Sequence, residues 1–153
     1  MPDNKFKFGE LKDKIKALKE RLPAELANQA QNYFVKSWTD QGYDGQPWKD
    51  VKRHDTSTSE YKYPIKLRAR KLSSPILVGV YKGRSGGRLR RAVSNSIRSK
   101  TFKSVKLRVD LPYAEAQNEG TGTIPARPFM KVSPILNQMH REKINQFMSD
   151  LWK

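Results

Sequence analysis

The chain has 153 residues, with 31 lysines and arginines against 15 aspartates and glutamates, so its formal net charge is +16. The length suits one domain, 1–153, and no apolar run approaches the roughly 20 residues of a membrane span, so a soluble chain without a signal peptide is expected. No cysteine is present, which excludes disulfides, thiol nucleophiles and Cys-based zinc sites.

The first predicted elements are two amphipathic helices. Apolar residues at steps of three and four predict a helix over about 7–22, and Pro23 should end or kink it and begin a second helix that stops at Gly42. The two apolar stripes are Phe8, Leu11, Ile15, Leu18 and Leu22, and then Leu26, Ala30, Phe34 and Trp38. Both stripes are expected to pack in the core, and the N-terminal one is the better candidate for docking a partner.

The following segment, 43–74, has no clear periodicity and is predicted to be a long, mobile loop within the domain. It contains Gly45, Pro47, a polar HDTSTSEY run and a basic YKYPIKLRARK run, with Trp48 as the expected anchor. A short apolar run from Ile76 to Tyr81 and a flexible basic turn, GRSGG at 83–87, come next.

A small antiparallel sheet with a basic hairpin is predicted over residues 93–110. Leu89, Val93 and Ile97 are spaced for a helix, while Val93 and Ile97 also alternate with polar residues as in a strand, and the sequence leaves both readings open. The half-buried strand is clearer: its inner residues are Phe102, Val105, Leu107 and Val109, and its outer face carries Lys106 and Arg108. The hairpin is expected to turn near 99–101.

The last elements are a short helix at 112–119 and a C-terminal helix. Pro112 suits a first helical turn, and Gly120 and Gly122 can end the short helix. Ser133 and Pro134 suit the cap and first turn of the terminal helix. One side of that helix is expected to carry Leu136, His140, Lys143, Phe147 and Leu151. Helices, strands and a final helix in this order predict an α+β fold.

Proline makes the segment from Leu111 to Met130, LPYAEAQNEGTGTIPARPFM, a stiff joint with few ionisable groups. Pro125 and Pro128 bias the backbone around Arg127 towards extended geometry. Two roles are open for that arginine: it caps carbonyl groups within the subunit, or it contacts another subunit. The candidate residues for a subunit or joint contact are Tyr113, Ile124, Pro125, Arg127, Pro128 and Phe129.

The positive charge is concentrated in the middle of the chain. Residues 61–111 hold 15 basic side chains against one acidic one, whereas 1–60 and 112–153 each carry a net charge of only +1. This block is a candidate contact for DNA or for an acidic partner, and a solvated basic face is the alternative. The candidate contact residues are Arg68, Arg70, Lys71, Arg84, Arg88, Arg90, Arg91, Lys106 and Arg108. No motif of a sequence-specific reader accompanies them.

The sequence offers no convincing catalytic or metal site. His54 and His140 have no neighbours at ligand spacing, and GRSGG lacks the ending of a phosphate-binding loop. Glu115 and Glu119 stand four residues apart and could act as a carboxylate pair, but a solvated face is the simpler interpretation. No enzymatic activity, cofactor or metal is therefore expected.

Three motifs together resemble the phage virion morphogenesis family, the Mu-like tail-completion proteins. They are GRLRRAVSNSI at 87–97, VKLRVDLPYAEAQNEG at 105–120 and IPARPFM at 124–130, and the resemblance covers about 76–130. VYKGRSGG at 80–87 departs from the family, whose connection into the Arg-Leu-Arg element is shorter and less basic.

The resemblance implies a small, non-enzymatic α+β phage protein that completes the tail or joins head and tail. The implied assembly is a homo-oligomeric ring that contacts tail-tube, neck or connector proteins, with no membrane and no small-molecule substrate. Genomic DNA, bound without sequence specificity, is a further candidate contact. Such a virion component would be assembled in the cytoplasm of the bacterial host. The alternative hypothesis is a non-specific nucleic-acid-binding protein that uses the basic 61–111 block.

Overall fold

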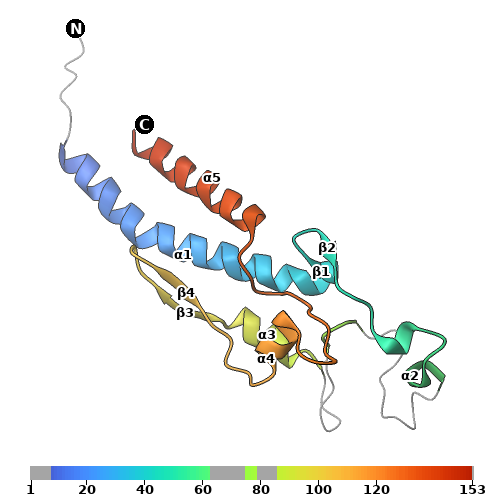
Figure 1. Ribbon diagram of the computed structural model, residues 1–153. Helices are drawn as coiled ribbons and strands as arrows, with labels where there is room; N and C mark the ends of the chain where they lie inside the picture. Colours follow the sequence, from blue (N-terminus) through green and yellow to red (C-terminus); the bar gives the residue numbers. More distant parts are fainter. Residues whose placement is uncertain (1–7, 63–74, 79–85, 153) are drawn as a thin grey trace. The chain divides into compact units, whose positions relative to one another are not determined.

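The computed structural model describes residues 8–62, 75–78 and 86–152, and its fold is α+β, as predicted (Figure 1). Its elements in chain order are α1 (Phe8–Asp40), β1 (Gly42–Tyr43), β2 (Gln46–Pro47), the 3-10 helix η1 (Lys52–His54), α2 (Ser59–Lys62), α3 (Arg88–Ser94), β3 (Ile97–Lys100), β4 (Val105–Leu107), α4 (Ala114–Glu119) and α5 (Pro134–Leu151). No helix in these described ranges has the length and apolar character that a membrane crossing requires.

The described chain forms two compact units. The helix-pair unit comprises residues 8–31, 97–108 and 133–152, and thus holds the first part of α1, the β3–β4 hairpin and α5. The joint unit comprises residues 32–62, 75–78, 86–96 and 109–132, with the end of α1, the β1–β2 hairpin and the short helices.

The predicted break at Pro23 is wrong, because Pro23 lies inside one 33-residue helix, α1. Proline removes one backbone hydrogen bond from a helix interior. Here the residue is buried, and Leu22 and Ala27 on either side of it are 7% and 0% exposed. Packing of a continuous apolar face thus outweighs the local preference. The face fades towards the N-terminus, where Phe8 is 76% exposed and Ile15 is 37% exposed.

Short elements occupy the described part of the segment predicted to be a loop. β1 and β2 pair antiparallel, and the two residues between them, Asp44 and Gly45, both have positive φ. Such a pair makes the two-residue turn that matches the twist of a hairpin. Trp48 follows and is 6% exposed, which confirms it as the anchor. Residues 63–74 and 79–85 lie outside the described residues, and so do the predictions made for them.

The region from 88 to 107 resolves the choice between helix and strand. Residues 88–94 form α3, which buries Leu89 and Val93. The hairpin begins only afterwards: β3 pairs antiparallel with β4, and Thr101 and Ser104 exchange backbone hydrogen bonds of 2.9 and 3.1 Å across the turn. The predicted strand therefore begins at Ile97 and not at Val93, and the predicted turn near 99–101 lies instead between Thr101 and Ser104.

Phe102 was predicted to be an inner residue of the strand, and this prediction is wrong. It lies in the turn and is 55% exposed, whereas Val105 and Leu107 are half-buried and Lys106 between them is exposed. Phe102 stands three residues before Val105, an odd step that breaks the two-residue period of a strand.

The two C-terminal helices agree well with their predictions. α4 starts at Ala114, two residues later than predicted, and ends at Gly120. α5 begins as expected: Ser133 caps it by accepting a 3.0 Å hydrogen bond from the backbone N–H of Leu136, and Pro134 is its first residue. The predicted inner side of α5 is confirmed, because all five of its residues are buried or half-buried.

Candidate functional site

The motif-bearing segment 111–130 folds back on itself around the side chain of Asn118. The Asn118 Oδ1 accepts hydrogen bonds from the backbone N–H groups of Phe129 (2.9 Å) and Met130 (3.0 Å). Its Nδ2 donates to the Met130 carbonyl at 3.2 Å and to Glu119 Oε1 at 2.6 Å. Asn118 is only 9% exposed, so one buried amide pairs three backbone groups of Phe129 and Met130 and fixes the course of the chain there.

Gly120 permits the reversal between α4 and the returning segment. Its φ is 78°, and a Cβ at this position would lie 2.7 Å from the backbone nitrogen of Ala126. Thr121 and Ile124 then exchange backbone hydrogen bonds of 3.0 and 2.8 Å. No side chain fits at Gly120 without displacing backbone.

Arg127 makes its hydrogen bonds within the joint unit. Its Nε donates to the Lys49 carbonyl at 2.9 Å, and its terminal NH2 donates to the Asp50 carbonyl at 3.1 Å. The residue is 8% exposed, and burial lowers the pKa of its guanidinium while the Asp50 carboxylate opposes that shift. The sequence left two roles open for Arg127, and these hydrogen bonds correspond to the first, the capping of carbonyl groups within the subunit.

A cluster of aromatic side chains packs against the IPARPF part of the joint. Trp38 packs edge-on against Trp48 with ring centroids 5.7 Å apart, and against Phe129 at 5.3 Å. The indole N–H of Trp48 donates to the Pro128 carbonyl at 2.6 Å. Phe129 is only 2% exposed, so the IPARPF segment is tied to the end of α1 and to the residue that follows β2.

Tyr43 ties the end of the joint to β1. Its hydroxyl donates to the Lys131 carbonyl at 2.5 Å and accepts from the Lys131 backbone N–H at 3.2 Å. Burial is the main reason why the pKa of Tyr43 rises to about 12, from an ordinary value of 10.0.

The raised pKa of Tyr43 predicts a loss of stability in strong alkali. The folded state holds the phenol proton more tightly than the unfolded state, so this contribution is complete below pH 10 and is lost as the pH rises towards 12. Denaturant midpoints measured from pH 8 to pH 12 should fall more for the wild type than for Tyr43→Phe, which has no proton to lose. Parallel curves for the two proteins would contradict the assignment.

The predicted subunit-contact residues divide into two groups. Arg127 and Phe129 are buried within the joint unit, and Pro128 offers its carbonyl to Trp48, so their contacts are internal. Tyr113 is 40% exposed, and Ile124 and Pro125 are half-buried. Tyr113, Ile124, Pro125 and the likewise half-buried Pro128 therefore keep surface that a neighbour can contact.

The basic residues fall in both units. Arg88, Arg90 and Arg91 are exposed on α3 in the joint unit, and Arg91 also donates to the Gly86 carbonyl at 3.0 Å. In the helix-pair unit, Lys106 and Arg108 are exposed on and just after β4. The remaining four, Arg68, Arg70, Lys71 and Arg84, lie outside the described residues.

The carboxylates and histidines of the described residues make local contacts. Glu119 pairs with Lys131 at 2.5 Å, and hydrogen bonding to that lysine is the main reason why the pKa of Glu119 is lowered. The exposed His54 lies 2.5 Å from Asp50, and burial lowers the pKa of His140. Within the described ranges, no three His, Asp or Glu residues gather as a metal site would require.

Sequence reasoning did not identify Asn118 or Tyr43 as parts of the joint. Asn118 is the last residue but one of α4, and asparagine within a helix is a usable signal, because it is a poor helix former unless its amide has a specific partner. Tyr43 carries no such signal, since its partner Lys131 is 88 residues away.

Neither a protein-family model, nor a curated protein, nor a solved structure matches this chain.

Proposed function

We propose that this chain is a non-enzymatic structural protein of a phage virion that completes the tail or joins head and tail, and that it assembles as a homo-oligomeric ring. The observation that carries the proposal is the order and spacing of three motifs, at 87–97, 105–120 and 124–130, which resemble those of the phage virion morphogenesis family.

The physical character of the joint supports a structural role. Its polar groups hold the backbone: Arg127 makes both of its hydrogen bonds, and Asn118 three of its four, to main-chain atoms of the same unit. A stiff, internally satisfied segment suits a protein that must present one fixed surface to its neighbours. Tyr113, Ile124 and Pro125 are the proposed subunit-contact residues of this segment.

The proposed partners are further copies of the chain and the tail-tube, neck or connector proteins of the same particle, in the virion and, before that, in the cytoplasm of a bacterial host. The second candidate function is non-specific nucleic-acid binding. It is favoured by Lys100, Lys103 and Lys106, which are exposed around the hairpin and make no ion pair with any residue in the described ranges.

The mass of the purified chain in solution tests the two functions against each other. A tail-completion protein should form a closed ring of defined mass, visible as annular particles by electron microscopy and stable to dilution. The mass should be measured by sedimentation velocity over a hundredfold range of concentration.

A non-specific nucleic-acid binder should instead remain monomeric and bind duplex DNA of any sequence, with an affinity that falls steeply as salt is raised. A chain that is monomeric at every concentration and binds neither DNA nor a tail-tube protein refutes both functions.

A further inference from the structure

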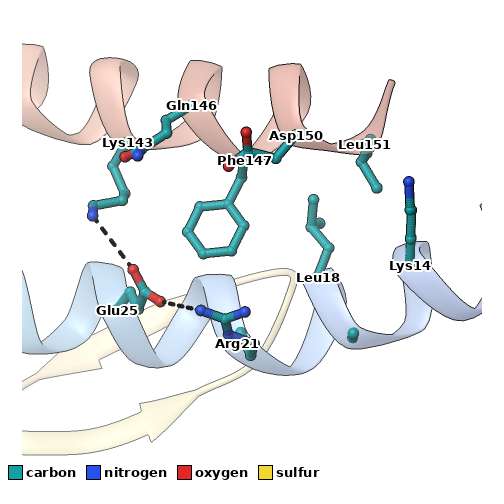
Figure 2. A pocket seen from close by; sticks show the side chains of 10 residues that line it. Lys14, Leu18, Arg21, Glu25, Lys143, Gln146, Phe147, Asp150 and Leu151 are labelled. Carbon is teal, nitrogen blue, oxygen red and sulfur yellow. Dashed lines mark hydrogen bonds and ion pairs between the residues drawn. The ribbon is translucent and has the colours of Figure 1, made fainter. Parts of the chain in front are cut away.

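The helix-pair unit has a polar side, which is a groove between α1 and α5. The groove has a volume of about 410 Å³ and is lined by Lys14, Ala17, Leu18, Arg21, Glu25, Lys143, Gln146, Phe147, Asp150 and Leu151. Figure 2 shows Glu25 between two cations, at 3.3 Å from Arg21 and 3.4 Å from Lys143, with the ring of Phe147 pointing towards α1. Glu25 therefore offsets part of the positive charge that Arg21 and Lys143 bring to the groove.

The opposite side of the same helix pair is apolar. Successive residues of an α-helix are turned by about 100° around its axis, so each residue of α1 can be placed relative to Leu18, which we take as the centre of the packed face. On this basis Ile15 lies on one flank of α1, and Lys14 and Arg21 lie on the other. Ile144 and Met148 likewise lie on the flank of α5 away from the groove. Since both groove flanks line a single cavity, both apolar flanks face the other way.

The side chains on this apolar side are substantially exposed. Ile15 and Ile144 are each 37% exposed and Met148 is 45% exposed, while Trp152, just past the end of α5, is 68% exposed. Large apolar side chains gathered on one side of a helix pair are unlike the scattered apolar residues of an ordinary surface.

The hairpin turn extends this apolar side. The Lys19 ammonium lies 5.9 Å from the centroid of the Phe102 ring, and Lys19 is on the same flank of α1 as Ile15. The contact brings the exposed Phe102 ring to the edge of this flank, and Lys100 and Lys103, near it in the sequence, are exposed as well.

The charge around the apolar side has one sign. Lys12 and Lys19 of α1 and Arg141 of α5 fall on its edges, and all three are exposed. The carboxylates of these two helical segments project instead towards the groove or the outer faces; they are Glu10, Asp13, Glu20, Glu25, Glu142 and Asp150. An apolar strip with a purely basic rim is complementary to a helix that is apolar on one face and acidic beside it.

We propose that the apolar side of the helix-pair unit, formed by Ile15, Ile144 and Met148 with Phe102 and Trp152 at its ends, is a docking surface for an acidic amphipathic helix of another protein. A second copy of this chain fits less well, because it would bring the basic rim against an identical basic rim. The surface lies outside the joint unit and does not depend on the virion role.

A synthetic helix tests the proposal with the full-length chain. The probe is a labelled 18-residue peptide with leucine at positions spaced three and four apart and glutamate elsewhere, and binding is followed by fluorescence anisotropy. One control peptide has the same composition in scrambled order, and another has lysine in place of glutamate. The patterned acidic peptide should bind at least about tenfold more tightly than either control.

A pair of matched variants locates the binding surface. Met148→Glu should weaken binding of the patterned peptide about tenfold or more, since it places a carboxylate in the centre of the strip. Ile135→Glu adds the same charge to the same helix at a residue that is 48% exposed but lies on the groove flank, and it should leave binding unchanged. Circular dichroism should show that both variants are folded.

Other results overturn the proposal. Equal binding of the scrambled peptide would mean simple charge attraction, and equal loss in both variants would mean that the strip is not the site. Loss of wild-type self-association on Met148→Glu would assign the strip to a second copy. An intact ring that ignores all three peptides would refute this docking surface while leaving the virion role standing.

Discussion

Replacing Phe129 by alanine should lower the free energy of unfolding of the joint unit by about 3–5 kcal/mol. The ring is 2% exposed and packs on Trp38 at 5.3 Å, so its removal leaves a cavity beneath the returning segment. Urea titration followed by the fluorescence of the buried Trp38 and Trp48 measures the change.

Phe102→Ala is the matched control, because that ring is 55% exposed and should contribute less than about 0.5 kcal/mol. Similar losses for the two variants would mean that the aromatic cluster does not hold the joint together.

Arg127→Ala should destabilise the joint unit by about 3 kcal/mol, because the backbone carbonyls of Lys49 and Asp50 lose the charged hydrogen-bond donor of a buried side chain. Arg127→Lys should recover only part of the loss, since an ammonium lacks the planar fork that reaches both the Lys49 and Asp50 carbonyls. The same urea titration measures both variants.

Arg90→Ala, at an exposed position on α3, should change stability by less than about 0.5 kcal/mol. If Arg127→Ala instead kept wild-type stability and lost only its assembly state, the arginine would be a subunit contact and the internal capping would be of minor importance.

The elements that the sequence predicts well are those whose signals are local. The cap and the inner side of α5 follow from Ser133, Pro134 and a three-to-four spacing, and the end of α4 follows from Gly120. In each case the residue type and the required backbone geometry agree within one or two turns of chain.

The errors arise where a local signal competes with packing or was given too little weight. Pro23 is a strong helix breaker by itself, yet burial of its neighbours keeps α1 continuous. The Asp44–Gly45 pair is a recognisable hairpin signal, but the polar sequence around it led to the prediction of a loop. Phe102 was counted as a strand residue although its spacing from Val105 is odd.

The candidate site was predictable as a stiff segment but not as a set of contacts. The prolines and Gly120 mark the segment 111–130, and its few ionisable groups led to the prediction of a packing and docking element. Its partners Tyr43, Trp48 and Lys49 lie about 80 residues earlier, and no local pattern indicates such pairings. For the same reason, one sequence could not decide between the two roles of Arg127.

These distant pairings also set the order in which the joint unit can be completed. The hydrogen bonds that close it link residues 77 to 88 positions apart, so they cannot form until the ribosome has synthesised the chain through Lys131. Until then Trp38 and Trp48 lack the Phe129 ring that completes their cluster. Non-local closure of this kind slows folding and prolongs exposure of apolar surface, so the nascent chain is a natural client for chaperones until its last quarter emerges.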